Sequence, residues 1–282
     1  MVRRSILICA LLTVAPLLRA QKPTEAPVDL VLKRAGDYLS DYTKAYASVV
    51  AEEKYVQSLT EKRVASLGAV TGKLRTELKS DVVAVADITQ AWVNFRDVYQ
   101  VDGKAIRDRD QRLQKLFLDP KSDPLTKARS ITDEGARFNL GTVSRNVNFP
   151  TMALTFLLTA NQPRSKFKRA GDGKVSGVET EIVEFDETVR PTIVRSGPAD
   201  LPVAGRFWIE PLTGRVMKSA VRFESRDFKG EVTVTFALVE KLKMWLPIEM
   251  DDSCSSPRET VNGRATYSNF RRFGVSTDVV IK

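Results

Sequence analysis

The clearest pattern in the chain is an alternation of apolar and polar residues over positions 205–250. Side chains of a β-strand point alternately to the two faces of a sheet, so a period of two predicts strands with one buried face. Pro, Thr and Gly at 211–214 have the composition of a tight turn. We therefore predict an antiparallel meander. The apolar rows of its first three strands are Phe207 and Ile209; Met217, Ser219, Val221 and Phe223; and Val232, Val234, Phe236 and Leu238.

In the N-terminal half, a helical period comes first and a strand period follows it. Apolar residues recur every three to four positions and predict an amphipathic helix over about 25–48, with Thr24 as its cap. From residue 49, β-branched and aromatic residues alternate with polar ones and predict three strands in 49–108, with turns at 67–72 and 89–90. The pair Asp102-Gly103 within this segment is a typical hairpin signal.

Helical periodicity returns in the middle of the chain. One helix is expected before Pro120, a second over about 123–138 and a short apolar helix over 151–158. The strand pattern resumes at Arg164, with a turn expected at 170–173.

The last strands are expected at 264–273 and 275–281. We expect an α+β fold, in which a curved antiparallel sheet carries an N-terminal helix and a helical insertion at about 107–159.

The first twenty residues are typical of a secretory signal peptide. Arg3 and Arg4 precede an apolar run over 6–18, and Ala20 offers a small residue for cleavage. We expect cleavage near Ala20, which leaves 21–282 as a single domain in the periplasm or outside the cell. The processed chain keeps one cysteine, so an intramolecular disulfide is not expected.

The amino-acid composition excludes several classes of catalytic and metal site. The chain has no histidine, which excludes Ser-His-Asp catalysis, Cys-His catalysis and zinc sites that use imidazole. No P-loop or Gly-x-Ser-x-Gly motif is present. The net charge of +9 comes from interspersed basic and acidic residues, so we expect a mixed surface and no nucleic-acid partner. We expect no cofactor, no metal and no enzymatic activity.

The individual polar candidates have ordinary structural interpretations. Glu52 and Glu53 are adjacent, so on a strand they point to opposite faces and cannot form an acid–base pair. We interpret both as solvated carboxylates. Asp108 and Asp110 stand among arginines at an expected helix start, where negative charge is stabilising without a metal. Cys254 is expected in a polar loop, without a histidine to activate it.

The 151–158 helix is apolar nearly all round, so it should be buried or contact an apolar guest. We predict that it covers the concave face of the sheet as a lid. Ordinary core packing remains the alternative. The candidate ligand-binding residues on this helix and the sheet beneath it are Met152, Leu154, Phe156, Leu157, Phe207, Ile209, Val221, Phe223, Val234 and Phe236.

This order of elements resembles the periplasmic lipoprotein carriers and receptors of the LolA/LolB type. GRFWIEPLTGRVMKSAVRF (205–223) is similar to their strand–turn–strand, and VTVTFA (232–237) to the strand that follows. The resemblance implies an unclosed half-barrel with a helical lid. It also implies an exported bacterial, non-enzymatic envelope protein that binds a lipid, a lipoprotein acyl chain or another apolar ligand, with transient contact at a membrane surface.

Two other functions stay open at this point. The fold that the resemblance implies also serves as a sensor module, and a protein-interaction module of an envelope complex is an alternative that an open apolar sheet face or uncovered edge strand would favour. A histidine-free hydrolase that uses Asp or Glu would require two carboxylates facing each other in a cleft, roughly 5–10 Å apart.

Overall fold

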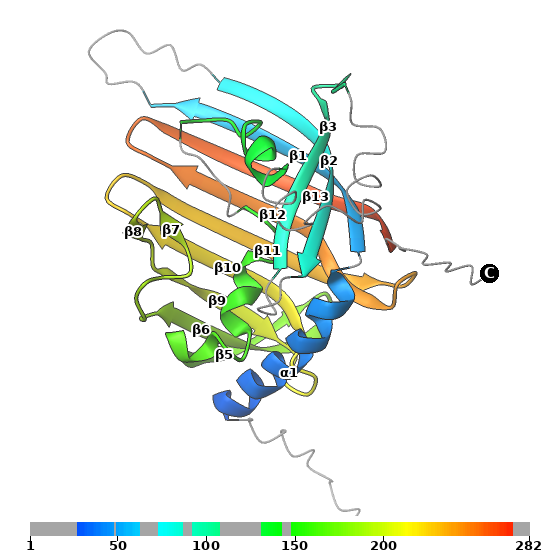
Figure 1. The fold of residues 1–282 in the computed structure, drawn as a ribbon. Coiled ribbons are helices and arrows are strands. Elements are labelled where there is room, and N and C mark those ends of the chain that lie inside the picture. The colour runs from blue at the N-terminus through cyan, green and yellow to red at the C-terminus, as the bar shows by residue number, and fades with distance from the viewer. Residues whose placement is uncertain are drawn as a thin grey trace, which may run out of the picture.

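The computed structural model describes residues 27–47, 49–62, 73–86, 92–107, 131–142 and 148–272. Within these ranges the chain forms one eleven-stranded antiparallel sheet, a separate two-stranded hairpin and short helical segments (Figure 1). The strand order is β4-β3-β2-β1-β13-β12-β11-β10-β9-β6-β5. The two ends of this order do not pair, so the curved sheet is unclosed. The predicted α+β class with a curved antiparallel sheet and an N-terminal helix is confirmed.

The helices are α1 (Val28–Tyr46), η1 (Met152–Leu157) and η2 (Gln162–Arg164), the last two being 3-10 helices. The strands of the large sheet are β1 (Val49–Glu61), β2 (Lys73–Ala86), β3 (Trp92–Val101), β4 (Lys104–Ala105), β5 (Ser165–Val175), β6 (Val178–Glu187), β9 (Val203–Ile209), β10 (Val216–Glu224), β11 (Lys229–Val239), β12 (Met244–Ser255) and β13 (Glu259–Arg272). The separate hairpin consists of β7 (Arg195–Ser196) and β8 (Ala199–Asp200).

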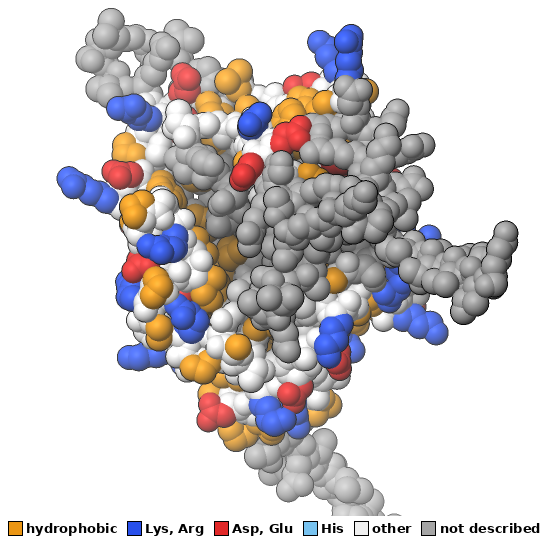
Figure 2. All heavy atoms as spheres, in the orientation of Figure 1, with side chains coloured by type: hydrophobic (Ala, Val, Ile, Leu, Met, Phe, Trp, Pro, Cys, Tyr) orange, Lys and Arg blue, Asp and Glu red, His pale blue; other side chains and the backbone are white. Residues whose placement is uncertain are grey.

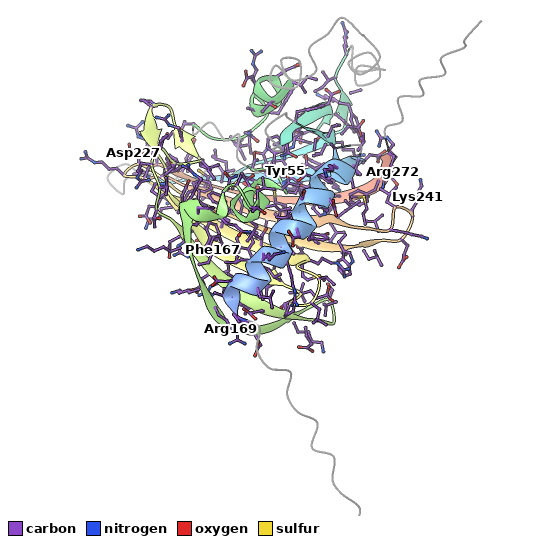
Figure 3. All side chains as sticks on the ribbon, turned by 60° about the horizontal axis from the view of Figure 1, so that its bottom comes forward. Tyr55, Phe167, Arg169, Asp227, Lys241 and Arg272 are labelled. Carbon is purple, nitrogen blue, oxygen red and sulfur yellow. The ribbon has the colours of Figure 1, made fainter. Side chains whose placement is uncertain are left out.

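Helix α1 packs across the concave face of the sheet, and Figure 3 shows it running obliquely between the sides marked by Arg169 and Arg272. Two long-range contacts to backbone oxygens fix it there. Arg34 Nη1 donates to the oxygen of Pro211 at 2.7 Å, and Gln162 Nε2 donates to the oxygen of Leu32 at 2.9 Å. The helix predicted over about 25–48 is thereby confirmed. Its N-cap is Pro27, with no side-chain cap bond.

The main core lies between α1, η1 and the sheet. Phe156 of η1 packs on Phe185, with ring centroids 4.9 Å apart, and Phe185 stacks on Phe207 at 5.0 Å. All three side chains are essentially inaccessible to solvent. The expected apolar helix at 151–158 is therefore a 3-10 helix packed on the sheet. Fully burying each such aromatic side chain stabilises the fold by about 1.5–3 kcal/mol.

The meander follows the predicted rows closely. In the turn between β9 and β10, Gly214 has a φ of +74°, and its N–H donates to the Glu210 oxygen at 2.9 Å. Only glycine adopts such a backbone conformation at little cost. The exception to the predicted rows is Leu238, which is 41% exposed near the end of β11.

The turn predicted at 170–173 is wrong. β5 continues through these residues to Val175, and the chain reverses at Ser176 and Gly177, which both have positive φ. A register shift between Arg169 and Gly171 absorbs the glycine as a bulge within the strand. The two glycines of 170–173 thus mark an irregular edge strand, which composition alone cannot distinguish from a turn.

Part of the helical insertion packs over the other half of the concave face. Residues 131–136 are helical, within the helix predicted at about 123–138. Thr132 Oγ1 donates to the oxygen of Asn94 at 3.1 Å, and Gln57 Nε2 donates to the oxygen of Phe138 at 3.0 Å. These contacts connect the insertion to β3 and β1.

Several predictions lie outside the described residues. They are the signal peptide at 1–20, the cap Thr24, the turns at 67–72 and 89–90, the helix before Pro120, the strand at 275–281, and the residues Asp108 and Asp110.

The convex face of the sheet is polar. Glu184 of β6 lies between Lys168 and Arg206 on the neighbouring strands, with nitrogen–oxygen distances of 2.8 Å to Lys168 and 2.7 Å to Arg206 Nε. Arg264 similarly contacts Glu249 at 2.6 Å. Figure 2 shows the opposite, covered side of the sheet, and around its rim basic and acidic side chains are likewise mixed rather than gathered by sign. Exposed pairs of this kind contribute little to stability and keep the sheet surface solvated.

Candidate functional site

A buried polar network lies on the concave face, beneath the insertion. Glu53 of β1 is 1% exposed and stands directly between Ser80 of β2 and Tyr267 of β13 in the register of the sheet. The Ser80 hydroxyl donates to one carboxylate oxygen at 2.9 Å, and the Tyr267 hydroxyl donates to the other at 3.0 Å. The interpretation of Glu53 as a solvated carboxylate is therefore wrong, because its partners come from strands distant in sequence.

Arg96 of β3 neutralises this carboxylate. Its Nε and Nη2 both donate to Glu53, the latter at 2.8 Å, which gives a bidentate pair with both side chains buried. Burial by itself lowers the pKa of Arg96, but the charge and hydrogen bonds of Glu53 raise it by more, so the guanidinium stays protonated. The guanidinium also lies 4.8 Å from the ring centroid of Tyr55 and 5.2 Å from that of Phe149.

A chain of hydrogen bonds leads from Arg96 towards β12. Arg96 Nη2 donates to the backbone oxygen of Asn148 at 3.2 Å. Asn148 Nδ2 donates to the Tyr55 hydroxyl at 3.1 Å, and that hydroxyl donates to Asp252 Oδ1 at 2.8 Å. Tyr55 reaches Asp252 over Gly263, where a Cβ atom would lie 2.6 Å from Tyr55 Cε2. Glycine is therefore required at this point of β13.

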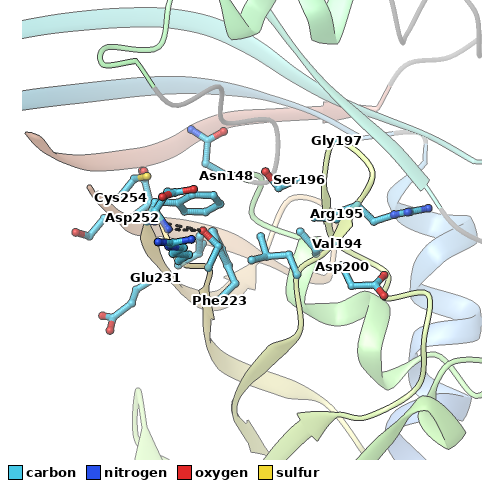
Figure 4. Close-up of a pocket in the computed structure, with 18 residues that line it drawn as sticks. Asn148, Val194, Arg195, Ser196, Gly197, Asp200, Phe223, Glu231, Asp252 and Cys254 are labelled. Carbon is cyan, nitrogen blue, oxygen red and sulfur yellow. Dashed lines mark hydrogen bonds between the residues drawn. The ribbon is translucent and has the colours of Figure 1, made fainter. Parts of the chain in front are cut away.

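Asp252 and Asn148 also line a cavity of about 820 Å³. Figure 4 shows it between the ends of the sheet strands and the β7–β8 hairpin. Its lining comes from four regions: the segment before η1, the hairpin, the turn joining β10 to β11, and β12. The lining residues on these regions are Asn148; Val194, Arg195, Ser196, Gly197, Ala199, Asp200 and Leu201; Phe223, Ser225, Arg226, Asp227, Phe228, Glu231 and Val232; and Asp252, Ser253 and Cys254.

The cavity wall is divided by polarity. Phe223, Val232 and Leu201 are buried apolar side chains, so part of the wall offers hydrocarbon contact. Asn148 and Asp252 are 2% and 7% exposed and supply polar groups at the inner wall. Such a combination of apolar lining and a few fixed polar groups is typical of small-molecule sites, whose volumes are about 300–1,000 Å³.

The hairpin over the cavity is anchored at its base. Thr192 N–H donates to Asp200 Oδ1 at 2.8 Å, and this bond is the main reason that the pKa of Asp200 lies below its usual value. Glu187 of β6 accepts the Ile193 N–H at 2.7 Å. The strand residues of the hairpin are exposed, so these contacts hold its position through its base.

Nine of the ten predicted ligand-binding residues are buried in one apolar cluster, against which the partly buried Met152 packs. Phe223 is the member of the ten that also lines the cavity. Sequence reasoning missed Glu53, Arg96, Asn148 and Asp252. One signal was available for Glu53, because the alternation along β1 places it on the buried row.

The expectation for Cys254 is wrong. The residue lies within β12 rather than in a polar loop, and it is buried at 6% exposure beside the cavity. The polar stretch around it is held as a strand by pairing with β11 and β13 on either side.

Among the described residues, no group of three or more His, Cys, Asp and Glu side chains is arranged to hold a metal. In the same part of the chain, no helix has the length and apolarity needed to cross a bilayer.

No protein-family model matches the chain, and no curated protein sequence matches it. Among solved structures, a DUF1329 family protein from Desulfovibrio piger is similar over 89% of this chain and 95% of its own, with 11% identity and a TM-score of 0.37. An outer membrane lipoprotein-sorting protein domain from Vibrio parahaemolyticus is similar over 88% and 94%, with 12% identity and a TM-score of 0.36. Because TM-scores this low carry no functional weight, the function of this protein has to be inferred from its cavity.

Proposed function

We propose that this protein is a non-enzymatic envelope protein that binds a lipid, a lipoprotein acyl chain or another apolar ligand in the cavity beside Phe223. The supporting observation is a cavity of about 820 Å³ with an apolar wall, at the end of the concave face. A hydrocarbon group that replaces water against the apolar part of this wall contributes about 25 cal/mol per Å² of apolar surface buried. Export of the chain follows from the signal peptide expected at 1–20.

The apolar cluster under η1 has a supporting role in this proposal. Phe156, Phe185 and Phe207 stack on one another and fill the space below the helix. This packing fixes the sheet from which Phe223 reaches the cavity. A ligand would therefore lie between the hairpin and the strand ends, beside the predicted floor residues.

The first test is native mass spectrometry of protein purified without detergent from the exporting host, followed by lipid extraction. We expect a population that carries additional mass and releases an amphiphile on extraction. Protein that emerges empty, and that binds no dodecyl amphiphile in titrations, would contradict the proposal.

A matched pair of variants separates the cavity from the core. Phe223→Ala removes a phenyl group that lines the cavity, and we expect it to weaken dodecyl-chain binding roughly tenfold to a hundredfold. Phe156→Ala removes a phenyl group from the packed core, and we expect it to lower the free energy of unfolding by about 3–5 kcal/mol while affinity stays nearly unchanged. The opposite result would place the ligand under η1. Calorimetric titration and denaturant unfolding measure the two effects.

A further inference from the structure

The large sheet ends in a long strand that has a neighbour on one side only. β5 is the last strand in the sheet order and runs for 11 residues, whereas β4 at the other end has 2. β5 pairs with β6, and no other described strand pairs with it. Figure 3 marks this strand with Phe167 and Arg169. The backbone N–H and C=O groups on the free side of such a strand are able to pair with another chain.

The regular part of this strand is its first half. The register with β6 is unbroken over 165–169 and shifts before Gly171. A bulge disrupts regular pairing and bends the strand, so a further strand is expected to pair over 165–169, which we call the β5 edge. Its side chains alternate between the two faces of the sheet. Lys166 and Lys168 are exposed, whereas Phe167 is half-buried against the core.

The strand already paired with β5 shows which side chains complement this edge. Opposite the run of cation, aromatic and cation, β6 places an acid, an aromatic and an acid: Asp186, Phe185 and Glu184. Lys168 Nζ lies 2.8 Å from a Glu184 oxygen, and the ring centroids of Phe167 and Phe185 are 6.0 Å apart. Lys166 forms no ion pair with any other described residue. A strand on the free side would meet the same side chains of β5.

A second copy of the chain does not suit this edge. Two copies related by a two-fold axis and paired over 165–169 would be centred on Phe167, so Lys166 of one copy would face Lys168 of the other. Like charges directly opposite each other on a sheet are destabilising. Lysine side chains and bulges are features by which natural sheets avoid pairing edge to edge. The same cations favour a strand that carries acids.

We propose that the β5 edge binds an extended acidic segment of a partner protein, which adds a strand to the sheet beside β5. The segment carries two acids separated by one apolar residue. Its acids face Lys166 and Lys168, and its apolar residue lies beside Phe167. Backbone hydrogen bonds hold the added strand, and the two lysines select it by charge. None of the described residues that line the cavity belongs to β5, so this interaction is separate from the lipid binding proposed above.

The test uses a synthetic peptide with the sequence of β6, VETEIVEFDE (178–187), because that strand complements the same side chains. The control peptide, VQTQIVQFNQ, has each acid replaced by its amide. Both carry a fluorescent label and are titrated with the native protein at low salt by anisotropy. We expect the acidic peptide to bind about threefold to thirtyfold more tightly than the control. The difference should shrink at roughly 0.5 M salt, because salt screens exposed charges.

Hydrogen exchange and a pair of variants then locate the peptide. We expect slower amide exchange over 165–169 in the complex, as measured by mass spectrometry. Lys166→Glu should weaken binding of the acidic peptide about tenfold, because it turns an attraction into a repulsion. Lys241→Glu is the matched control, since it makes the same change at an exposed position in the turn between β11 and β12.

Each part of the proposal has its own contrary result. Equal affinity for the two peptides would overturn the preference for acids. Equal losses in the two variants, or binding that leaves exchange over 165–169 unchanged, would overturn the β5 edge as the site. If neither peptide binds, the proposal as a whole is overturned. These outcomes are distinguishable from a failure of lipid binding, which is measured with dodecyl amphiphiles at the cavity.

Discussion

At the scale of single residues, Glu53 and Arg96 form an ion pair in the interior of the protein. Both side chains are nearly inaccessible, and Ser80 and Tyr267 complete the hydrogen bonds of the carboxylate. A buried pair of this kind contributes little over an apolar replacement of both members, but removing one partner leaves an uncompensated charge. The network therefore acts chiefly to fix the strands and side chains that border the cavity.

The difference between removing one member of the pair and replacing both can be tested with single and double substitutions. Arg96→Met should lower the free energy of unfolding by about 3–5 kcal/mol, because Glu53 then stays buried without its counter-charge. Adding Glu53→Gln should recover part of the loss, since the amide that replaces the carboxylate is neutral and still able to accept from Ser80 or Tyr267. Denaturant unfolding of the two single variants and the double variant measures the coupling. Strictly additive losses would show that the pair is not an interacting unit.

The buried polar residues also show which contacts could not be predicted from the sequence. In the structure, Glu53 and Tyr55 share the buried face of β1, although the sequence analysis interpreted Glu53 as a solvated carboxylate. Their partners could not be found in the same way, because Arg96 and Asp252 lie 43 and 197 positions further along the chain. The contacts depend on strand register, and register between distant strands is set by the whole sheet.

At the scale of elements, α1 and the meander were predictable because their apolar rows repeat with the period of the structure. β12 was only partly predictable, since Asp251, Asp252 and Ser253 have low strand propensity and are held by pairing on both sides. The hairpin at 195–200 has no strong pattern of its own. The cavity exists only because this hairpin lies over the strand ends, so its position could not be derived from either segment alone.

Helix α1 also predicts a dependence on pH. Its tyrosines stack in series, with centroids of Tyr38 and Tyr42 5.7 Å apart and of Tyr42 and Tyr46 5.4 Å apart. Burial raises the pKa of Tyr38 to about 12 and raises the pKa values of Tyr42 and Tyr46 well above the ordinary value. Burial and the charge of Glu53 do the same to the pKa of Tyr267.

The direction in which stability changes with pH follows from how many protons the folded and unfolded states bind. Above pH 10 or so, unfolded tyrosines lose protons that the folded tyrosines keep, so the unfolded state is favoured. We expect the contribution of these tyrosines to the free energy of unfolding to be independent of pH below about pH 10. It should fall as the pH rises towards 12 and beyond. Tyr46→Phe removes one such group and should flatten the decline. Denaturant unfolding across this range measures it, and an unchanged slope in the variant would contradict the assignment.

At the scale of the whole molecule, the sheet separates two environments. The convex face carries charged residues in cross-strand pairs, whereas the concave face is covered by α1, η1, residues 131–142 and the hairpin. The cavity lies beside the hairpin, and the hydrogen-bonded chain through Tyr55 links its wall to the Glu53–Arg96 pair. We therefore place ligand binding at one end of the concave face.

The most direct test of this placement uses Cys254 as a reporter, because the processed chain is expected to contain no other cysteine and this thiol borders the cavity. The rate of its alkylation by iodoacetamide is measured by mass spectrometry, with and without a saturating dodecyl amphiphile. A control protein carrying Cys254→Ser and Ser268→Cys reports from the exposed convex face. We predict that the amphiphile slows alkylation of Cys254 and leaves the control rate unchanged. Saturable binding of the amphiphile without any protection of Cys254 would contradict ligand binding in this cavity.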